Sequence, residues 1–97
     1  MSKVIFEVNY HIKPEKRNEY FGIIEEIKKL NSSTGIDYSV YENKKNSNNF
    51  SEIYVCNSEE EFDTLEDKQG DAILDLNDKI NSLLSDAKVS YSTKYEI

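Results

Sequence analysis

His11 is the only histidine in this chain of 97 residues, and its side chain is the one best suited to moving protons near neutral pH. An unperturbed imidazole titrates near pH ~6.5 and can act as a general acid or base. Glu7 would lie on the same strand face, but about 13 Å away by strand rise, too far to orient the ring. Asn9 is nearer, and Tyr41 could approach only from a neighbouring strand. Without such a partner, His11 is a partly solvated histidine near a strand end.

Tyrosine is the second chemically useful residue type. The chain has seven tyrosines and four phenylalanines but no tryptophan. Tyr10, Tyr38 and Tyr91 occur in three predicted strands, where all three could point toward the helices. A buried tyrosine brings a large apolar ring and a hydroxyl that needs a partner. Three of them around a cavity could bind an aromatic molecule and hydrogen-bond its oxygens. Ordinary core packing is the alternative, because tyrosine favours strands.

Nucleophilic and metal chemistry have little support in the sequence. Cys56 is the only cysteine, which leaves no internal disulfide and no cysteine-based zinc site. With no histidine near it in sequence, a structural thiol is the simpler interpretation. Asp71, Asp75 and Asp78 share one helix face, whereas calcium loops place their ligands on a tight turn with a glycine. The chain also lacks a glycine-rich phosphate loop and a nucleophile elbow. We therefore predict no metal site and no cofactor.

The charge of the chain is concentrated in one segment. The chain has 19 acidic and 12 basic side chains and a formal charge of −7. Residues 59–79 hold nine acids and two lysines, so this segment alone carries −7 and the remainder is neutral. Nucleic acids and anionic membranes are bound by clustered Lys and Arg, so we predict neither as a partner. The acidic segment is most simply the solvated face of a helix, and docking to a basic protein is the alternative.

The elements that position these residues follow from hydrophobic spacing. Residues 4–12 alternate apolar and polar side chains, which predicts a strand. Apolar residues then recur at helical spacing, which predicts a helix from about Pro14 to Asn31 that stops before Gly35. A polar, turn-rich loop is expected at 43–49. Further strands are predicted at 36–42, 50–56 and 88–97, and the facing of the strand at 50–56 is left open.

A second helical region is expected between the last two strands. Ser58 and Glu61 have the spacing of a capping box, which predicts a helix start. The segment 67–70 contains a glycine and should break or kink this helix. Asp71 can cap the continuation, whose apolar residues again have helical spacing.

The predicted order β-α-β-β-α-β is that of the ferredoxin-like α+β fold. A four-stranded antiparallel sheet would carry two helices on one face, in a single domain spanning residues 1–97. The other face would present a mostly polar set, namely Glu7, Asn9, His11, Asp37, Ser39, Tyr41, Ser90, Ser92 and Lys94. Ile5 and Tyr41 interrupt the polar character of this face. Either the face is open to water, or two sheets meet across a two-fold axis and enclose a partly polar lumen.

Two segments carry a resemblance to a known superfamily. The stretch Tyr10-His11-Ile12-Lys13-Pro14-Glu15 resembles the strand-to-helix junction of dimeric α/β barrels of the antibiotic-biosynthesis-monooxygenase-like superfamily. Residues 50–62 resemble the third strand and second-helix start of that group. The resemblance spans nearly the whole chain and reports topology more than chemistry. It implies a homodimer whose paired sheets form a barrel, with any ligand pocket between the sheet and helices of each subunit.

The activities of that superfamily constrain the expected function. They include cofactor-independent oxygenation of phenolic polycycles, degradation of haem and isomerisation of small lactones. The haem-degrading branch uses an Asn on the first strand, a Trp, and a His on the second helix. This chain has no Trp, and its one histidine lies on the first strand. Asn9 points away from the usual pocket, so we do not expect haem degradation.

We therefore expect a small cytoplasmic homodimer that binds a small apolar or aromatic molecule. If it is an enzyme, it would be a cofactor-independent monooxygenase or isomerase. The predicted catalytic residues are Tyr10 and His11, and the predicted substrate-binding residues are Asn9, Tyr38, Tyr41 and Tyr91. The alternative is a ligand-binding or protein-interaction module without turnover, which a sheet–helix interface lacking any cavity above ~300 Å³ would favour. No run of ~20 apolar residues is present, so no membrane span is predicted.

Overall fold

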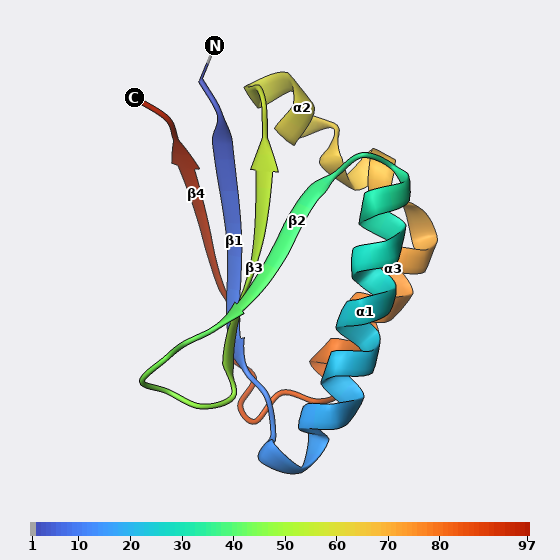
Figure 1. Cartoon of the computed structure of the whole chain (residues 1–97), viewed down its shortest axis with the longest axis vertical. Helices are drawn as coiled ribbons and strands as arrows, with labels where there is room; N and C mark the ends of the chain where they lie inside the picture. Colours follow the sequence, from blue (N-terminus) through green and yellow to red (C-terminus); the bar gives the residue numbers. More distant parts are fainter. Residues whose placement is uncertain (1) are drawn as a thin grey trace.

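A computed structural model describes residues 2–97, and its elements follow the predicted order. A single turn of 3₁₀ helix, η1 (Pro14–Lys16), precedes the first long helix. Figure 1 shows the two long helices on the same side of the sheet. The elements are β1 (Val4–His11), α1 (Arg17–Ser33), β2 (Asp37–Glu42), β3 (Asn49–Cys56), α2 (Glu59–Asp63), α3 (Leu65–Asn81) and β4 (Ser90–Tyr95). The predicted ferredoxin-like fold is confirmed.

The four strands form one antiparallel sheet in the order β2-β3-β1-β4. Val8 at the middle of β1 lies opposite Glu52 of β3 and Tyr91 of β4. Directly opposed residues point to the same side of a sheet, so these three side chains share the helix-facing side. This alignment settles which side chains of β3 face the helices, a point that the sequence left open. Its side chains that point toward the helices are Phe50, Glu52, Tyr54 and Cys56.

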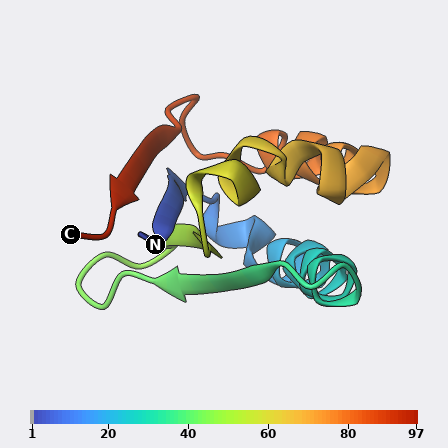
Figure 2. The same cartoon turned by 90° about the horizontal axis from the view of Figure 1, so that it is seen from above.

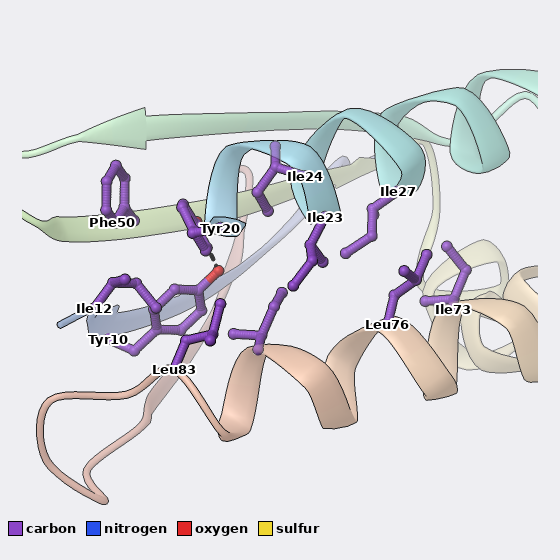
Figure 3. Packing of buried hydrophobic residues seen from close by; sticks show 11 residues of the cluster. Tyr10, Ile12, Tyr20, Ile23, Ile24, Ile27, Phe50, Ile73, Leu76 and Leu83 are labelled. Atoms are coloured by element: carbon purple, nitrogen blue, oxygen red, sulfur yellow. Dashed lines mark hydrogen bonds between the residues drawn. The ribbon is translucent and has the colours of Figure 1, made fainter. Parts of the chain in front are cut away.

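The main core lies where α1 and α3 pack on each other and on one end of the sheet. In Figure 3, Ile23 and Ile27 of α1 point toward Ile73 and Leu76 of α3. Tyr20 of α1 is completely buried at the end of this cluster. A smaller cluster under α2 is formed by Val4, Ile36, Tyr54, Cys56 and Leu65.

The ends of the helices follow the local signals in the sequence. Gly35 takes a positive φ of 74° directly after α1, a conformation that costs glycine little. The Ser58 Oγ accepts a hydrogen bond from the Glu61 amide at 3.1 Å, which confirms the predicted cap of α2. The predicted break is also found, since Gly70 has φ 73° and ψ −174° inside α3. No helix within residues 2–97 combines the length and apolar character needed to cross a bilayer.

Candidate functional site

A cavity of about 550 Å³ lies between the helix-facing side of the sheet and the α2–α3 region. Its floor comes from β1 and β3, and α2 and α3 form the opposite wall. Tyr91 of β4 lines its side, together with Val89 just before that strand. Figure 2 shows α1 and the α2–α3 region on the same side of the sheet. The volume falls within the roughly 300–1,000 Å³ typical of small-molecule sites.

The floor of this cavity holds the buried carboxyl of Glu52. Only 4% of this residue is exposed, and it lies opposite Val8 and Val40 in the sheet. The Tyr38 hydroxyl donates to Glu52 Oε1 at 2.5 Å, and the Tyr10 hydroxyl donates to Oε2 at 2.8 Å. Among the described residues no Lys, Arg or His forms an ion pair with this carboxyl. Burial raises the pKa of Glu52, and the two tyrosine hydrogen bonds only partly oppose this shift.

A third tyrosine extends this hydrogen-bonded cluster into the core. The hydroxyls of Tyr10 and Tyr20 are 2.8 Å apart, and Figure 3 shows them meeting between β1 and α1. A hydroxyl has one proton to donate, so when Tyr10 donates to Glu52 the Tyr20 hydroxyl must be the donor to Tyr10. Burial, followed by the nearby Glu52 charge, raises the pKa of Tyr10 and Tyr38. Burial also raises the pKa of Tyr20. These hydroxyls therefore stay protonated and serve as donors.

The wall opposite the floor is more polar. Gln69 of α3 donates from Nε2 to the Tyr54 hydroxyl at 3.0 Å, and burial raises the pKa of Tyr54 to about 12. Asn77, about one turn before the end of α3, and Asn81, the last residue of α3, add further amide groups. The exposed acids Asp63 and Glu66 line the cavity at its rim, where α2 meets α3. The cavity thus combines apolar rings, amides and carboxyl groups.

The structure brings three of the predicted site residues to this cavity region. Tyr10 and Tyr38 meet at Glu52, and Tyr10 also lines the cavity. Tyr91 lines it from β4, where 69% of the residue is exposed. The ring of Phe6 stacks on Tyr91 with centroids 6.1 Å apart.

The other three predicted residues lie on the opposite sheet face. His11 contacts the hairpin loop through Nε2, which is 3.1 Å from Asn46 Nδ2. Asn9 Nδ2 donates to Ser51 Oγ at 2.9 Å, and Tyr41 is 59% exposed. Neighbouring residues of a strand point to opposite sides, so the two predicted catalytic residues, Tyr10 and His11, are on different faces of β1.

Glu52 was missed by the reasoning from sequence. A signal was present, because Glu52 alternates with Phe50 and Tyr54 and therefore shares their face. The continuous apolar run from Ile53 to Val55 obscured that alternation. Cys56, by contrast, is 1% exposed and burial raises the pKa of its thiol, which fits a structural role. Within residues 2–97, no three His, Cys, Asp or Glu side chains are grouped to hold a metal ion.

Comparison with known proteins identifies the fold. No family model and no curated protein matches the sequence. An antibiotic biosynthesis monooxygenase of known structure aligns at TM-score 0.80 and 17% identity, over 100% of this chain and 99% of that chain. SnoaB, a cofactor-independent oxygenase from Streptomyces nogalater, aligns at TM-score 0.75 and 11% identity, over 95% and 90% of the two chains. A dimeric ferredoxin-like protein from an uncultured marine organism aligns at TM-score 0.73 and 11% identity, over 100% and 90%. The chain has the ferredoxin-like fold of antibiotic-biosynthesis-monooxygenase-like proteins, as its sequence segments indicated.

Proposed function

We propose that this protein binds a small, largely apolar molecule in the cavity and acts on it through the Glu52 carboxyl. The observation that carries this proposal is a buried carboxyl without a cationic partner at the floor of a cavity of about 550 Å³. A carboxyl in such a place costs stability, because desolvation disfavours its charged form. Raised pKa values of this kind are typical of groups that transfer protons.

The chemistry that fits is proton removal from an acidic carbon–hydrogen bond. Glu52 would accept the proton from a methylene activated by neighbouring carbonyl or aromatic groups, while Tyr10 and Tyr38 hold the carboxyl in place. The resulting carbanion can react with dioxygen. One oxygen atom enters the product as a carbonyl and the other leaves as water, so the reaction needs no cofactor. Return of the proton to another carbon would instead give isomerisation. The shared fold with a cofactor-independent oxygenase supports the first route.

We also propose that the protein is a homodimer formed through the outer sheet face. Ile5 is 39% exposed there and Tyr41 is 59% exposed, so the face offers apolar surface for a second copy to cover. The match to a ferredoxin-like protein described as dimeric supports a dimer, though not a particular interface. In such a dimer Asn9, His11 and Tyr41 would face the space between the two sheets, on the other side of the sheet from the cavity. Light scattering at micromolar concentration tests the dimer, and a strict monomer would contradict it.

Oxygen consumption with anthrone-type substrates tests the catalytic role. We expect Glu52→Gln to lower the rate by about 10²–10⁴-fold, the usual contribution of a general base. Tyr10→Phe should give a smaller decrease, because Tyr38 still holds the carboxyl. His11→Asn provides the matched comparison on the outer face. A rate that depends on His11 and not on Glu52 would place the chemistry on the outer face and refute the role of Glu52.

Binding without turnover is the second candidate function. It is favoured by one observation, that each oxygen of Glu52 already accepts a hydrogen bond from a tyrosine. A ligand that fills the cavity would then need no proton transfer. Saturable binding with no oxygen consumption and no isomerised product for a panel of quinols and anthrones would support this function over the enzymatic one.

A further inference from the structure

We infer that the ligand of this cavity is an organic cation, a molecule with an aromatic-sized apolar body and an ammonium group. This inference rests on the proposed function, because it assumes that the cavity binds a small molecule. It goes further by naming the charge of that molecule, which comes from the lining, the surrounding field and the aromatic side chains.

The charged groups that line the cavity all have one sign. They are Glu52 at the floor and Asp63 and Glu66 at the rim, and no described Lys, Arg or His lines it. A carboxylate or phosphate on the ligand would meet these acids with no cation to pair with, and like charges in contact disfavour binding. An ammonium group at the rim would pair with Asp63 or Glu66. Its apolar body would then lie over Val8 and Phe6.

The field around the cavity has the same sign as its lining. The elements that form one wall, α2 and α3, span residues 59–81, and residues 59–79 of this region carry the whole formal charge of −7. Lys68 and Lys79 belong to this segment but do not line the cavity. A cleft lined with one sign of charge raises the local concentration of oppositely charged ligands, and added salt screens the effect. The net negative charge of the chain therefore lies in the helices that form one wall of this cavity.

Aromatic rings supply the second element of cation recognition. Phe6 has Phe62 at 5.7 Å, Tyr54 at 6.1 Å and Tyr91 at 6.1 Å between ring centroids. All four rings line the cavity. The face of an aromatic ring attracts an ammonium group placed within ~6 Å of its centroid, and groups of rings bind alkylated ammonium ions. Carboxylates next to such a group of rings favour a cation over a neutral molecule of the same shape.

Three fluorescent ligands of nearly equal size and different charge test the inference. They are a naphthylethylamine, the corresponding naphthylethanol and a naphthylacetate, with binding followed by naphthalene fluorescence anisotropy. The wild-type protein has no tryptophan to interfere, and binding to Leu74→Trp, which adds one, is followed by isothermal titration calorimetry instead. At low salt we expect the amine to bind at least ~10-fold more tightly than the alcohol, and the acetate to bind most weakly. The preference for the amine should fall as sodium chloride is raised.

Paired variants separate the rim from the general charge of the helix. Asp63→Asn with Glu66→Gln should reduce the preference for the amine to below ~3-fold. Asp75→Asn with Asp78→Asn removes the same charge from exposed positions of α3 outside the cavity, and should leave most of the preference. Leu74→Trp, at an exposed position that lines the cavity, should weaken all three ligands by adding bulk.

The outcomes distinguish this inference from the proposed function. If amine and alcohol bind equally and Leu74→Trp weakens both, the cavity binds small molecules and the inference about charge is wrong. If the amine preference follows the Asp75 and Asp78 pair instead of the rim pair, the cation is held on the helix surface and the inference is also wrong. If none of the three ligands responds to Leu74→Trp, binding in the cavity itself is refuted.

Discussion

Glu42 and Glu52 both belong to the helix-facing side of the sheet, yet their environments are opposite. Glu42 at the end of β2 accepts hydrogen bonds from Arg17 Nη2 at 2.7 Å and from the Asn48 amide at 2.9 Å. These contacts lower its pKa to about 2, the Arg17 hydrogen bond contributing most. Glu52 has no cationic partner, and burial raises its pKa. One carboxyl is paired at the surface, and the other is desolvated beside a cavity.

The difference separates a carboxyl that is paired at the surface from one that is buried without a cation. The Glu42 carboxylate connects the hairpin end of β2 to Arg17 at the start of α1. The guanidinium carbon of Arg17 also lies 4.8 Å from the centroid of the Phe21 ring. The charge of Glu42 is satisfied, so it has little tendency to take up a proton. Burial disfavours the charged form of Glu52, and neutral tyrosines are its only polar partners among the described residues. A site that tolerates this cost fits a group that exchanges protons or binds a cation.

Tyr10→Phe should give the largest change in stability. It removes a hydrogen bond to a buried carboxyl and leaves the Tyr20 hydroxyl without its acceptor, so we expect a loss of about 2 kcal/mol in the free energy of unfolding. Urea denaturation measures this. Tyr95→Phe is the matched control, since 54% of Tyr95 is exposed. A loss for Tyr10→Phe no larger than that of the control would show that the hydroxyl contributes nothing to the network.

Arg17→Met, at the other carboxyl, should lower the free energy of unfolding by less than Tyr10→Phe does. The substitution keeps an apolar stem beside Phe21 and removes the guanidinium from Glu42. Arg17 and Glu42 side chains are 37% and 30% exposed, so solvent screens their attraction. We expect a loss smaller than that of Tyr10→Phe, reduced further by salt. A loss larger than that of Tyr10→Phe would reverse the comparison between the two carboxyl groups.

The sequence predicted the fold better than the site. Alternation in the first strand, the Ser58–Glu61 cap and the break near Gly70 are local signals, and each was confirmed. The cluster around Glu52 joins β1, β2, β3 and α1, and its members are up to 42 residues apart in the sequence. Which of two alternating faces is buried in β3 depends on the register between strands. No local pattern contains that information when apolar residues occupy both faces.

The ends of the last strand and of the first long helix also differ from the prediction, because tertiary contacts set them. The predicted last strand, 88–97, is shorter in the structure, and pairs with β1 only over Ser90–Tyr95. The predicted helix end at Asn31 continues to Ser33, because the turn at Gly35 is made by backbone bonds such as Ile36 amide to Asn31 carbonyl at 2.9 Å. Asn31 itself is buried and accepts from Gln69, a contact between helices that spacing along one helix cannot show.

The two carboxyl groups should give stability opposite dependences on pH, and this is the smallest effect we expect. Glu42 has a lowered pKa, so its contribution is present above its ordinary value of 4.5 and is lost as the pH falls toward 2. Glu52 has a raised pKa, so the folded state binds the extra proton and stability falls as the pH rises above 4.5 through the raised value. Urea denaturation midpoints between pH 2 and 9 follow both changes in stability: an acid limb, where Glu42 takes up its proton, and an upper limb, where Glu52 loses its proton. Glu42→Gln should flatten the acid limb, by about 1 kcal/mol or less because the pair is partly exposed. Glu52→Gln should flatten the upper limb and leave the acid limb unchanged. Parallel curves for wild type and Glu52→Gln would mean that the buried carboxyl titrates alike in the folded and unfolded chain, and that its site does not perturb it.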